Sequence, residues 1–124
     1  MSTQPPLPSA ILVDLAALAV AAHQSGPRWS HESADLDLTL LSWPSPQQIA
    51  PHVNDEVDVL LIGVQGSGEV TVNAATYRLV PGMALLIPKG AQRSMRSTDD
   101  GWSYLSVHRR RRGLWPTVRG EPLR

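Results

Sequence analysis

The chain contains 124 residues with a formal net charge of zero, and it has neither cysteine nor phenylalanine. This length fits one domain with one core, since domains usually hold on the order of 100 to 150 residues. A neutral chain argues against long-range attraction to nucleic acid or acidic membranes, and the absence of cysteine excludes disulfides and cysteine-based zinc sites. We therefore expect a cytoplasmic protein whose core consists of Val, Leu and Ile, a composition that favours strands.

The beginning of the chain predicts a flexible arm followed by one helix. Residues 1–8 carry three prolines and no periodic apolar pattern, which is typical of a loose N-terminal arm. Residues 9–26 predict an amphipathic helix, because Ser9 is a suitable N-cap, apolar residues recur at helical spacing and Gly26 lies at the end. The apolar stretch is short and contains Asp14, so we do not expect it to cross a membrane.

The region 27–112 predicts short strands separated by turn residues. Leucines alternate with polar residues over 36–40, the period-two pattern of a half-buried strand. The apolar run 57–64 predicts a central strand that ends in a glycine-rich turn at 65–68. A hairpin is expected next, with its turn within 73–76.

The second half of this region continues the same pattern. Pro81-Gly82 is typical of a type II turn, and 83–87 predicts another buried strand before the turn at 88–90. Two last strands are expected within 92–108, on either side of a polar loop at 97–101. Seven or eight short strands with turns at regular intervals predict an all-β barrel or sandwich. The remaining residues, 113–124, are interpreted as a C-terminal tail.

One segment, residues 52–58, carries a row of polar side chains. In an extended strand, alternate side chains share a face, so four polar residues would lie on one side of the segment. These are His52, Asn54, Glu56 and Asp58. Three interpretations remain open for this row: a solvated strand edge, a pocket that faces a ligand, or a metal centre.

At this point the sequence resembles the cupin superfamily. The first cupin motif reads His-x-His, three or four residues, Glu, about six residues, Gly, and the second reads Gly, five residues, Pro-x-Gly-x-x-His, three residues, Asn. Gly82, Pro88 and Gly90 match the second motif at its spacing, and Gly66 with Gly68 matches the end of the first. The resemblance implies a small cupin β-barrel, or jelly roll, with one N-terminal α-helix.

In metal-binding cupins, as the resemblance implies, two His and a Glu of the first motif and the His of the second hold a divalent metal. Here only His52 keeps the family's residue type. The second His position holds Asn54, the Glu position holds Asp58 or Val59 depending on the spacing, and the second-motif His position holds Arg93. Arginine offers no lone pair and stays charged, so it cannot ligate a cation. We therefore expect no metal and no other cofactor.

Arg93 suggests two other roles inside such a barrel. It is expected to form an internal ion pair with Glu56 or Asp58, or to bind a ligand carboxylate. The chain also resembles a subgroup of small cupins that share His-x-Asn-x-Glu-x-Asp, Pro-Lys-Gly-x-x-Arg and Tyr-Leu-x-Val-His-Arg-Arg-Arg, a likeness that implies a fold more than an activity. The last motif contains the run 109–112, which we interpret as solvated or paired with acidic residues and not as a nucleic-acid contact.

Other isolated residues are interpreted as structural. His23, His31 and His108 are expected to be ordinary surface or packing residues. No Cys or Ser arrangement predicts a nucleophile.

The sequence thus predicts a cupin that binds a small molecule, with an anion as one candidate, through His52, Asn54, Glu56, Asp58 and Arg93. Whether it is an enzyme stays open. The alternative is a metal-dependent oxygenase or isomerase that uses His52 with Asp58 or Glu56. A homodimer is expected, and neither nucleic acid nor membrane is expected as a partner.

Overall fold

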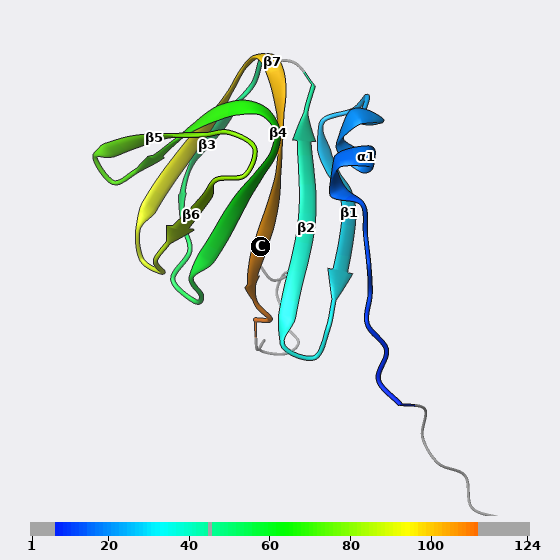
Figure 1. Cartoon of the computed structure of the whole chain (residues 1–124). Helices are drawn as coiled ribbons and strands as arrows, with labels where there is room; N and C mark the ends of the chain where they lie inside the picture. The colour runs from blue at the N-terminus through cyan, green and yellow to red at the C-terminus, as the bar shows by residue number, and fades with distance from the viewer. Residues whose placement is uncertain (1–6, 45, 112–124) are drawn as a thin grey trace, which may run out of the picture.

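The computed structural model describes residues 7–44 and 46–111, which form one helix and seven strands in a single curled antiparallel sheet (Figure 1). The elements in chain order are α1 (Leu15–Val20), β1 (Gly26–Glu32), β2 (Leu36–Trp43), β3 (Gln48–Val53), β4 (Val59–Val72), β5 (Ala75–Leu79), β6 (Ala84–Ile87) and β7 (Gln92–Arg109). The all-β prediction is therefore confirmed. The expected arm (1–8) and tail (113–124) lie largely or wholly outside the described residues.

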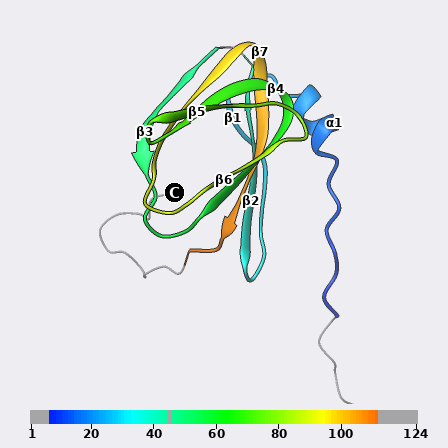
Figure 2. The same cartoon turned by 60° about the vertical axis from the view of Figure 1, so that its left-hand side comes forward.

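Two long strands, β4 and β7, organise the sheet. The strand order is β1-β2-β7-β4-β5, with β3 also paired to β7 and β6 also paired to β4. β7 therefore pairs with β2 along its second half and with β3 along its first half, while β4 pairs with it along most of its length. Figure 2 shows the result from the side: the sheet curls around an interior, with α1 outside it next to β4, β1 and β2.

The middle of β4 and β7 is bent by glycines, and here two expectations were wrong. Residues 65–68 do not form a turn, and residues 97–101 do not form a loop, because both segments continue their strands. The β4–β7 register shifts between Gly63 and Gln65 and between Gly66 and Gly68, and both Gly66 and Gly101 have positive φ. Such bulges bend a strand without reversing it.

A close backbone approach explains why glycine is needed at this bend. A Cβ placed on Gly66 would lie 2.1 Å from the carbonyl oxygen of Gly101, and one placed on Gly68 would lie 2.2 Å from the ring of Trp102. Two polar side chains at the bend have a partner on the neighbouring strand, since the hydroxyls of Ser67 and Thr98 form a hydrogen bond of 2.9 Å. Polar residues that resembled a loop in the sequence therefore fit inside a strand.

The helix is shorter than the sequence predicted. It begins after Asp14, not after Ser9, because the Asp14 carboxylate accepts a hydrogen bond of 3.0 Å from the Ala17 amide and acts as the N-cap. It ends at Val20, and Gly26, with φ of 108°, already belongs to β1. The apolar residues before Asp14 are not helical, and Ile11 and Leu12 are exposed. Within the described ranges, no helix is long and apolar enough to span a bilayer.

The turns were predicted better than the burial of the short strands. Gly82 and Gly90 both adopt positive φ, and the Met83 amide donates to the Val80 carbonyl as expected for a β-turn. The hairpin is tighter than expected, since Val72 already pairs with Ala75. β6 is not a buried strand: Leu86 is 61% exposed, because only one face of this edge strand meets the core.

Candidate functional site

The concave side of the curled sheet contains a cavity of about 840 Å³. Alternate residues of β2, β4 and β7 line it, as expected when one face of a strand turns inward. The side chains are mostly apolar toward the bend of the sheet and mostly polar toward the ends of β7. The fold therefore builds this pocket from several strands, of which β2, β4 and β7 contribute alternate residues.

The wall between β2 and β7 is a ladder of cross-strand pairs. Asp37 pairs with His108, Thr39 with Ser106 and Leu41 with Tyr104, and all six side chains line the cavity. The ladder thus changes from a carboxylate–imidazole pair through a hydroxyl pair to a largely apolar pair along the strands.

The wall between β3 and β7 repeats this order on the other side. His52 pairs with Arg93, and Ile49 pairs with Met95 deeper in the sheet, with a register shift between the two pairs. All four residues line the cavity. Each wall therefore carries a polar pair and, beyond it, apolar side chains.

Arg93 is the dominant charge of the second wall. Its Nε donates a hydrogen bond of 3.1 Å to Nε2 of His52, while its Nη1 is buried and has no hydrogen-bond partner among the described residues. Burial lowers the pKa of Arg93, and the nearby Arg111 guanidinium lowers it further, with Tyr104 acting in the opposite direction. The cavity thus holds a guanidinium with unused hydrogen-bonding capacity.

The predicted polar row of residues 52–58 does not form. β3 ends at Val53, and the Asn54 side chain accepts hydrogen bonds from the amides of Glu56 and Val57, at 2.9 and 3.3 Å, which turns the chain. The strand assumption was wrong because an Asx turn competes with extended structure. Of the five predicted site residues, only His52 and Arg93 line the cavity.

The two acidic residues of that row have other partners. Asp58 accepts a hydrogen bond of 2.8 Å from the Lys89 amide, and Glu56 lies 3.7 Å from Nε of Arg111. Among the described residues, Arg93 bonds to His52 and forms no ion pair with Glu56 or Asp58, so the expected internal ion pair is also wrong.

The donor set does not fit a divalent metal. Nε2 of His52, the nitrogen that would coordinate, instead accepts from the Arg93 guanidinium. The Asn54 side-chain oxygen is used by the loop, and the other candidate for the Glu position, Val59, contributes an apolar side chain to the cavity. Across residues 7–44 and 46–111, no three His, Asp or Glu side chains come together as metal ligands would.

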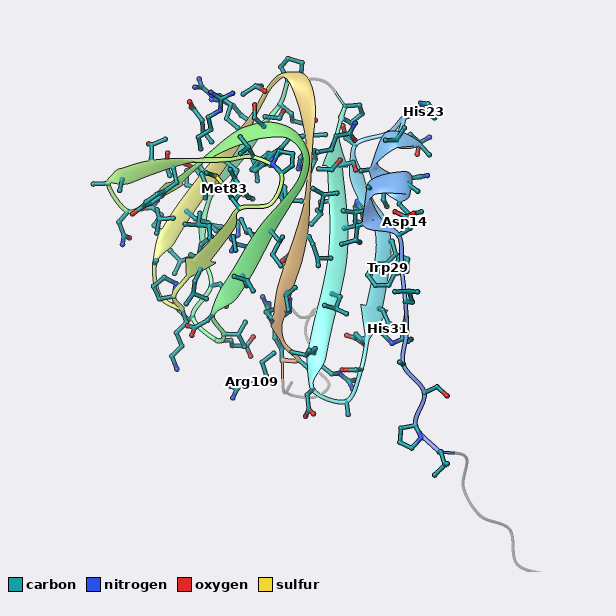
Figure 3. All side chains as sticks on the ribbon, viewed as in Figure 1. Asp14, His23, Trp29, His31, Met83 and Arg109 are labelled. Atoms are coloured by element: carbon teal, nitrogen blue, oxygen red, sulfur yellow. The ribbon has the colours of Figure 1, made fainter. Side chains whose placement is uncertain are left out.

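Sequence reasoning missed several cavity residues. Asp37 is a buried member of a strand whose leucines suggested that its polar face would meet solvent, and His108 appeared isolated. His31 also lines the cavity; its ring stacks on Trp29 along β1, with centroids 6.4 Å apart (Figure 3). The period-two pattern does place Tyr104, Ser106 and His108 on one face, which is the signal that could have found them.

The arginine run at the end of β7 is in part paired. Arg110 lies 3.9 Å from Glu32, and Arg111 lies 3.7 Å from Glu56. Figure 3 places Arg109 at the end of the strand, where it is exposed. These ion pairs support the interpretation that the run meets acidic residues of the chain, while Arg112 lies outside the described residues.

Comparison with solved structures shows the same fold at low sequence identity. A protein from Bacillus halodurans matches with a TM-score of 0.73 and 18% identity, over 89% of this chain and 88% of its own. A cupin-2 domain containing protein from Shewanella frigidimarina matches with a TM-score of 0.68 and 17% identity, over 80% and 95%. KdgF from a Halomonas species matches with a TM-score of 0.61 and 22% identity, over 66% and 74%.

Comparison with curated proteins found no match. The family model of the AraC-like ligand binding domain matches residues 35–123, which is most of the chain and includes every strand from β2 onward. The chain is thus a small cupin domain, and it belongs to the AraC-like ligand binding domain family.

Proposed function

We propose that this domain binds a small anionic molecule in the barrel cavity, without an intact metal centre. The observation that carries the proposal is the state of Arg93: this residue lines a cavity of about 840 Å³, and its buried Nη1 has no hydrogen-bond partner among the described residues. A buried charged donor without a partner is costly, by several kcal/mol for an ion that is fully removed from water. A carboxylate or another oxyanion in the cavity would supply the missing acceptor.

A second positive charge supports an anion over a neutral ligand. Arg111 also lines the cavity, and its charge adds to the effect of burial, which is the main cause of the lowered pKa of Arg93. Two like charges in one partly buried space repel each other, and an anion between them would relieve this repulsion. Arg111 is held by Glu56 at 3.7 Å, so it stands at the cavity as a second cation already oriented.

The family and the cavity lining support small-molecule binding in general. The matched family is described as a ligand binding domain, and the match covers most of the cavity-lining strands. The lining combines apolar side chains with a few polar groups, which is typical of small-molecule sites. The metal-dependent alternative through His52 and Asp58 or Glu56 has less support, because Asp58 bonds to the Lys89 amide and Glu56 faces Arg111.

The proposal is tested by binding of simple anions to the full chain. Acetate, butanoate, benzoate and inorganic phosphate are titrated at constant ionic strength, and binding is followed by thermal shift and by the fluorescence of Trp43, which lines the cavity. At least one of these anions should bind saturably, and Arg93→Gln should weaken it by about tenfold or more, the loss expected for a charge-assisted hydrogen bond.

Arg78→Gln is the matched control, because Arg78 is exposed on β5 and does not line the cavity. It makes the same change in net charge and should leave the affinity within about twofold. Equal weakening by both variants would indicate non-specific charge attraction and would contradict the proposal. Failure of all four anions to bind the wild-type chain would contradict it as well.

Three further features complete the proposal: a homodimer, a cytoplasmic location and no nucleic-acid partner. The dimer is supported by exposed Met83 and Leu86, which provide apolar surface for association. The location is supported by the absence of cysteine, which fits a reducing compartment. The net charge of zero argues against a nucleic-acid partner. Sedimentation of the purified chain tests the dimer, and a monomer at micromolar concentration would remove it.

A further inference from the structure

A second polar pair lies in the same cavity, on the wall that the anion proposal does not use. Asp37 and His108 face each other between β2 and β7, and their side chains are only 7% and 12% exposed. The distance from Oδ2 of Asp37 to Nε2 of His108 is 3.8 Å. Both residues line the cavity together with Arg93.

The hydrogen bonds of His108 show which kind of group this pair could bind. Nδ1 lies 2.9 Å from the Arg109 carbonyl oxygen, and a carbonyl only accepts, so Nδ1 carries a proton in this contact. In the neutral ring, Nε2 then presents a lone pair beside the Asp37 carboxylate, which also accepts. Their separation of 3.8 Å is too long for a direct hydrogen bond. One donor nitrogen at about 2.9 Å from each of the two atoms would bridge them.

The two polar pairs lie at the same end of the barrel. Arg93 is near the start of β7 and His108 is near its end, and Figure 1 shows both ends of this strand in the lower part of the sheet with its middle at the top. The electrostatic effect of Arg111, which follows β7, on Arg93 agrees with this arrangement. Leu41 and Met95 line the cavity one or two cross-strand pairs further along each wall. A ligand would therefore meet a cationic wall and an acceptor wall at one end, with apolar surface beyond.

We propose that the ligand is a zwitterion whose ammonium group binds between Asp37 and His108 while its carboxylate binds Arg93. An ammonium group carries a positive charge and three donors, so it satisfies two acceptors of which one is a carboxylate. A hydroxyl group has a single donor and no charge, and it matches this pair less well. The inference rests on the proposed function and adds the chemical class of the ligand.

The test compares amino carboxylates with carboxylates of the same length in the full chain. The probes are β-alanine, γ-aminobutyrate, δ-aminovalerate and ε-aminocaproate, each paired with propanoate, butanoate, pentanoate or hexanoate, and affinity is measured by calorimetry at neutral pH. At least one amino carboxylate should bind about tenfold more tightly than its partner, the gain expected for a charge-assisted contact. Asp37→Asn, which keeps the side-chain shape, should abolish this difference and leave carboxylate binding within about twofold.

Asp58→Asn is the matched control, because Asp58 is exposed and does not line the cavity. It should keep the preference for the amino carboxylate. If Asp37→Asn does not fold, His108→Gln replaces it and should reduce the preference as well. A wild-type chain that binds carboxylates through Arg93 with no preference for any amino carboxylate would overturn this inference and leave the proposed function intact. A preference that survives Asp37→Asn would also overturn it, whereas the absence of any carboxylate binding would refute the proposed function itself.

Discussion

At the residue scale, burial in the cavity changes the acid–base behaviour of two neighbouring side chains. Burial raises the pKa of Tyr104, while the Arg93 charge partly opposes this shift, and burial lowers the pKa of Arg93. In both cases the charged form is disfavoured, as expected where water is largely excluded. The cavity therefore accepts Arg93 as a cation at an energetic cost, which a bound anion would reduce.

The raised pKa of Tyr104 predicts a loss of stability in alkaline solution. The unfolded chain releases the phenolic proton near the ordinary value of 10.0, whereas the folded chain keeps it. The folded state therefore binds more protons above that pH, and the free energy of unfolding falls as pH rises, by at most about 1.4 kcal/mol per pH unit for one group. Tyr104→Phe should flatten this decline in urea unfolding measured between pH 9 and 11, values chosen to bracket the ordinary value of about 10.

Tyr77 provides the control for this measurement, because it is 46% exposed on β5. Tyr77→Phe should keep the alkaline decline of the wild-type chain. An equal effect of the two substitutions would show that burial of Tyr104 is not the cause.

The candidate site could be predicted from the sequence only where the chain keeps a motif. The motif spacing identified His52 and Arg93, and the structure pairs them across β3 and β7. The neighbours Asn54, Glu56 and Asp58 were misplaced, because an Asx turn can only be recognised once the end of the strand is known. Asp37 and His108 were missed, since their contact depends on the register of two strands that lie far apart in the sequence.

At the scale of the elements, glycines decide how β4 can bend and cross its neighbours. Gly63 on β4 lies against the turn that precedes β6, where its amide donates to the Met83 carbonyl and its carbonyl accepts from the Gly82 amide. Its φ is ordinary, so glycine is required here for space and not for backbone conformation. Gly82 is the reverse case, with open space around it and a φ of 89°.

These two glycines predict different costs for substitution by alanine. A Cβ on Gly63 would lie 2.2 Å from the Val80 carbonyl oxygen, and a backbone atom cannot move aside cheaply. Gly63→Ala should destabilise the chain by about 3 kcal/mol or more, whereas Gly82→Ala should cost only about 1 kcal/mol for its positive φ. Urea unfolding measures both, and a smaller loss for Gly63→Ala would contradict the packing described.

The short helix α1 depends on its cap. Asp14→Ala removes the acceptor of the Ala17 amide and should lower the local stability of the helix by about 1 kcal/mol. Hydrogen exchange of the Ala17 amide should then accelerate by about fivefold. Asp14→Ser keeps an acceptor and should restore most of the protection; if it exchanges as fast as the alanine variant, the capping assignment is wrong.

Element types were predicted better than element continuity. The turns at Gly82 and Gly90 follow from local backbone chemistry, which a sequence displays directly. The uninterrupted course of β7 does not follow from local chemistry, because residues 97–101 are polar and join the strand through partners on the neighbouring strand such as Ser67. The length of the helix was overestimated, because the helical spacing of apolar residues does not reveal that Asp14 provides the cap.

At the scale of the whole molecule, β7 connects the two walls of one cavity. Its first half carries Arg93 beside β3, and its second half carries His108 beside β2. The glycine-containing bend between the halves brings both walls around the same interior (Figure 2). The fold thus converts one long strand into two facing surfaces, each of which brings a polar pair to the cavity.

The central claim is that the Arg93 guanidinium is the anion-binding group of this cavity. The most direct measurement is a titration of the chain with butanoate, followed through the side-chain Nε–H resonances of its arginines by heteronuclear NMR, with the Arg93 signal assigned from its absence in Arg93→Gln. If Arg93 binds the anion, the Arg93 resonance shifts saturably while the exposed Arg78 resonance stays in place. An Arg93 resonance that stays unchanged while butanoate saturates another site would contradict it.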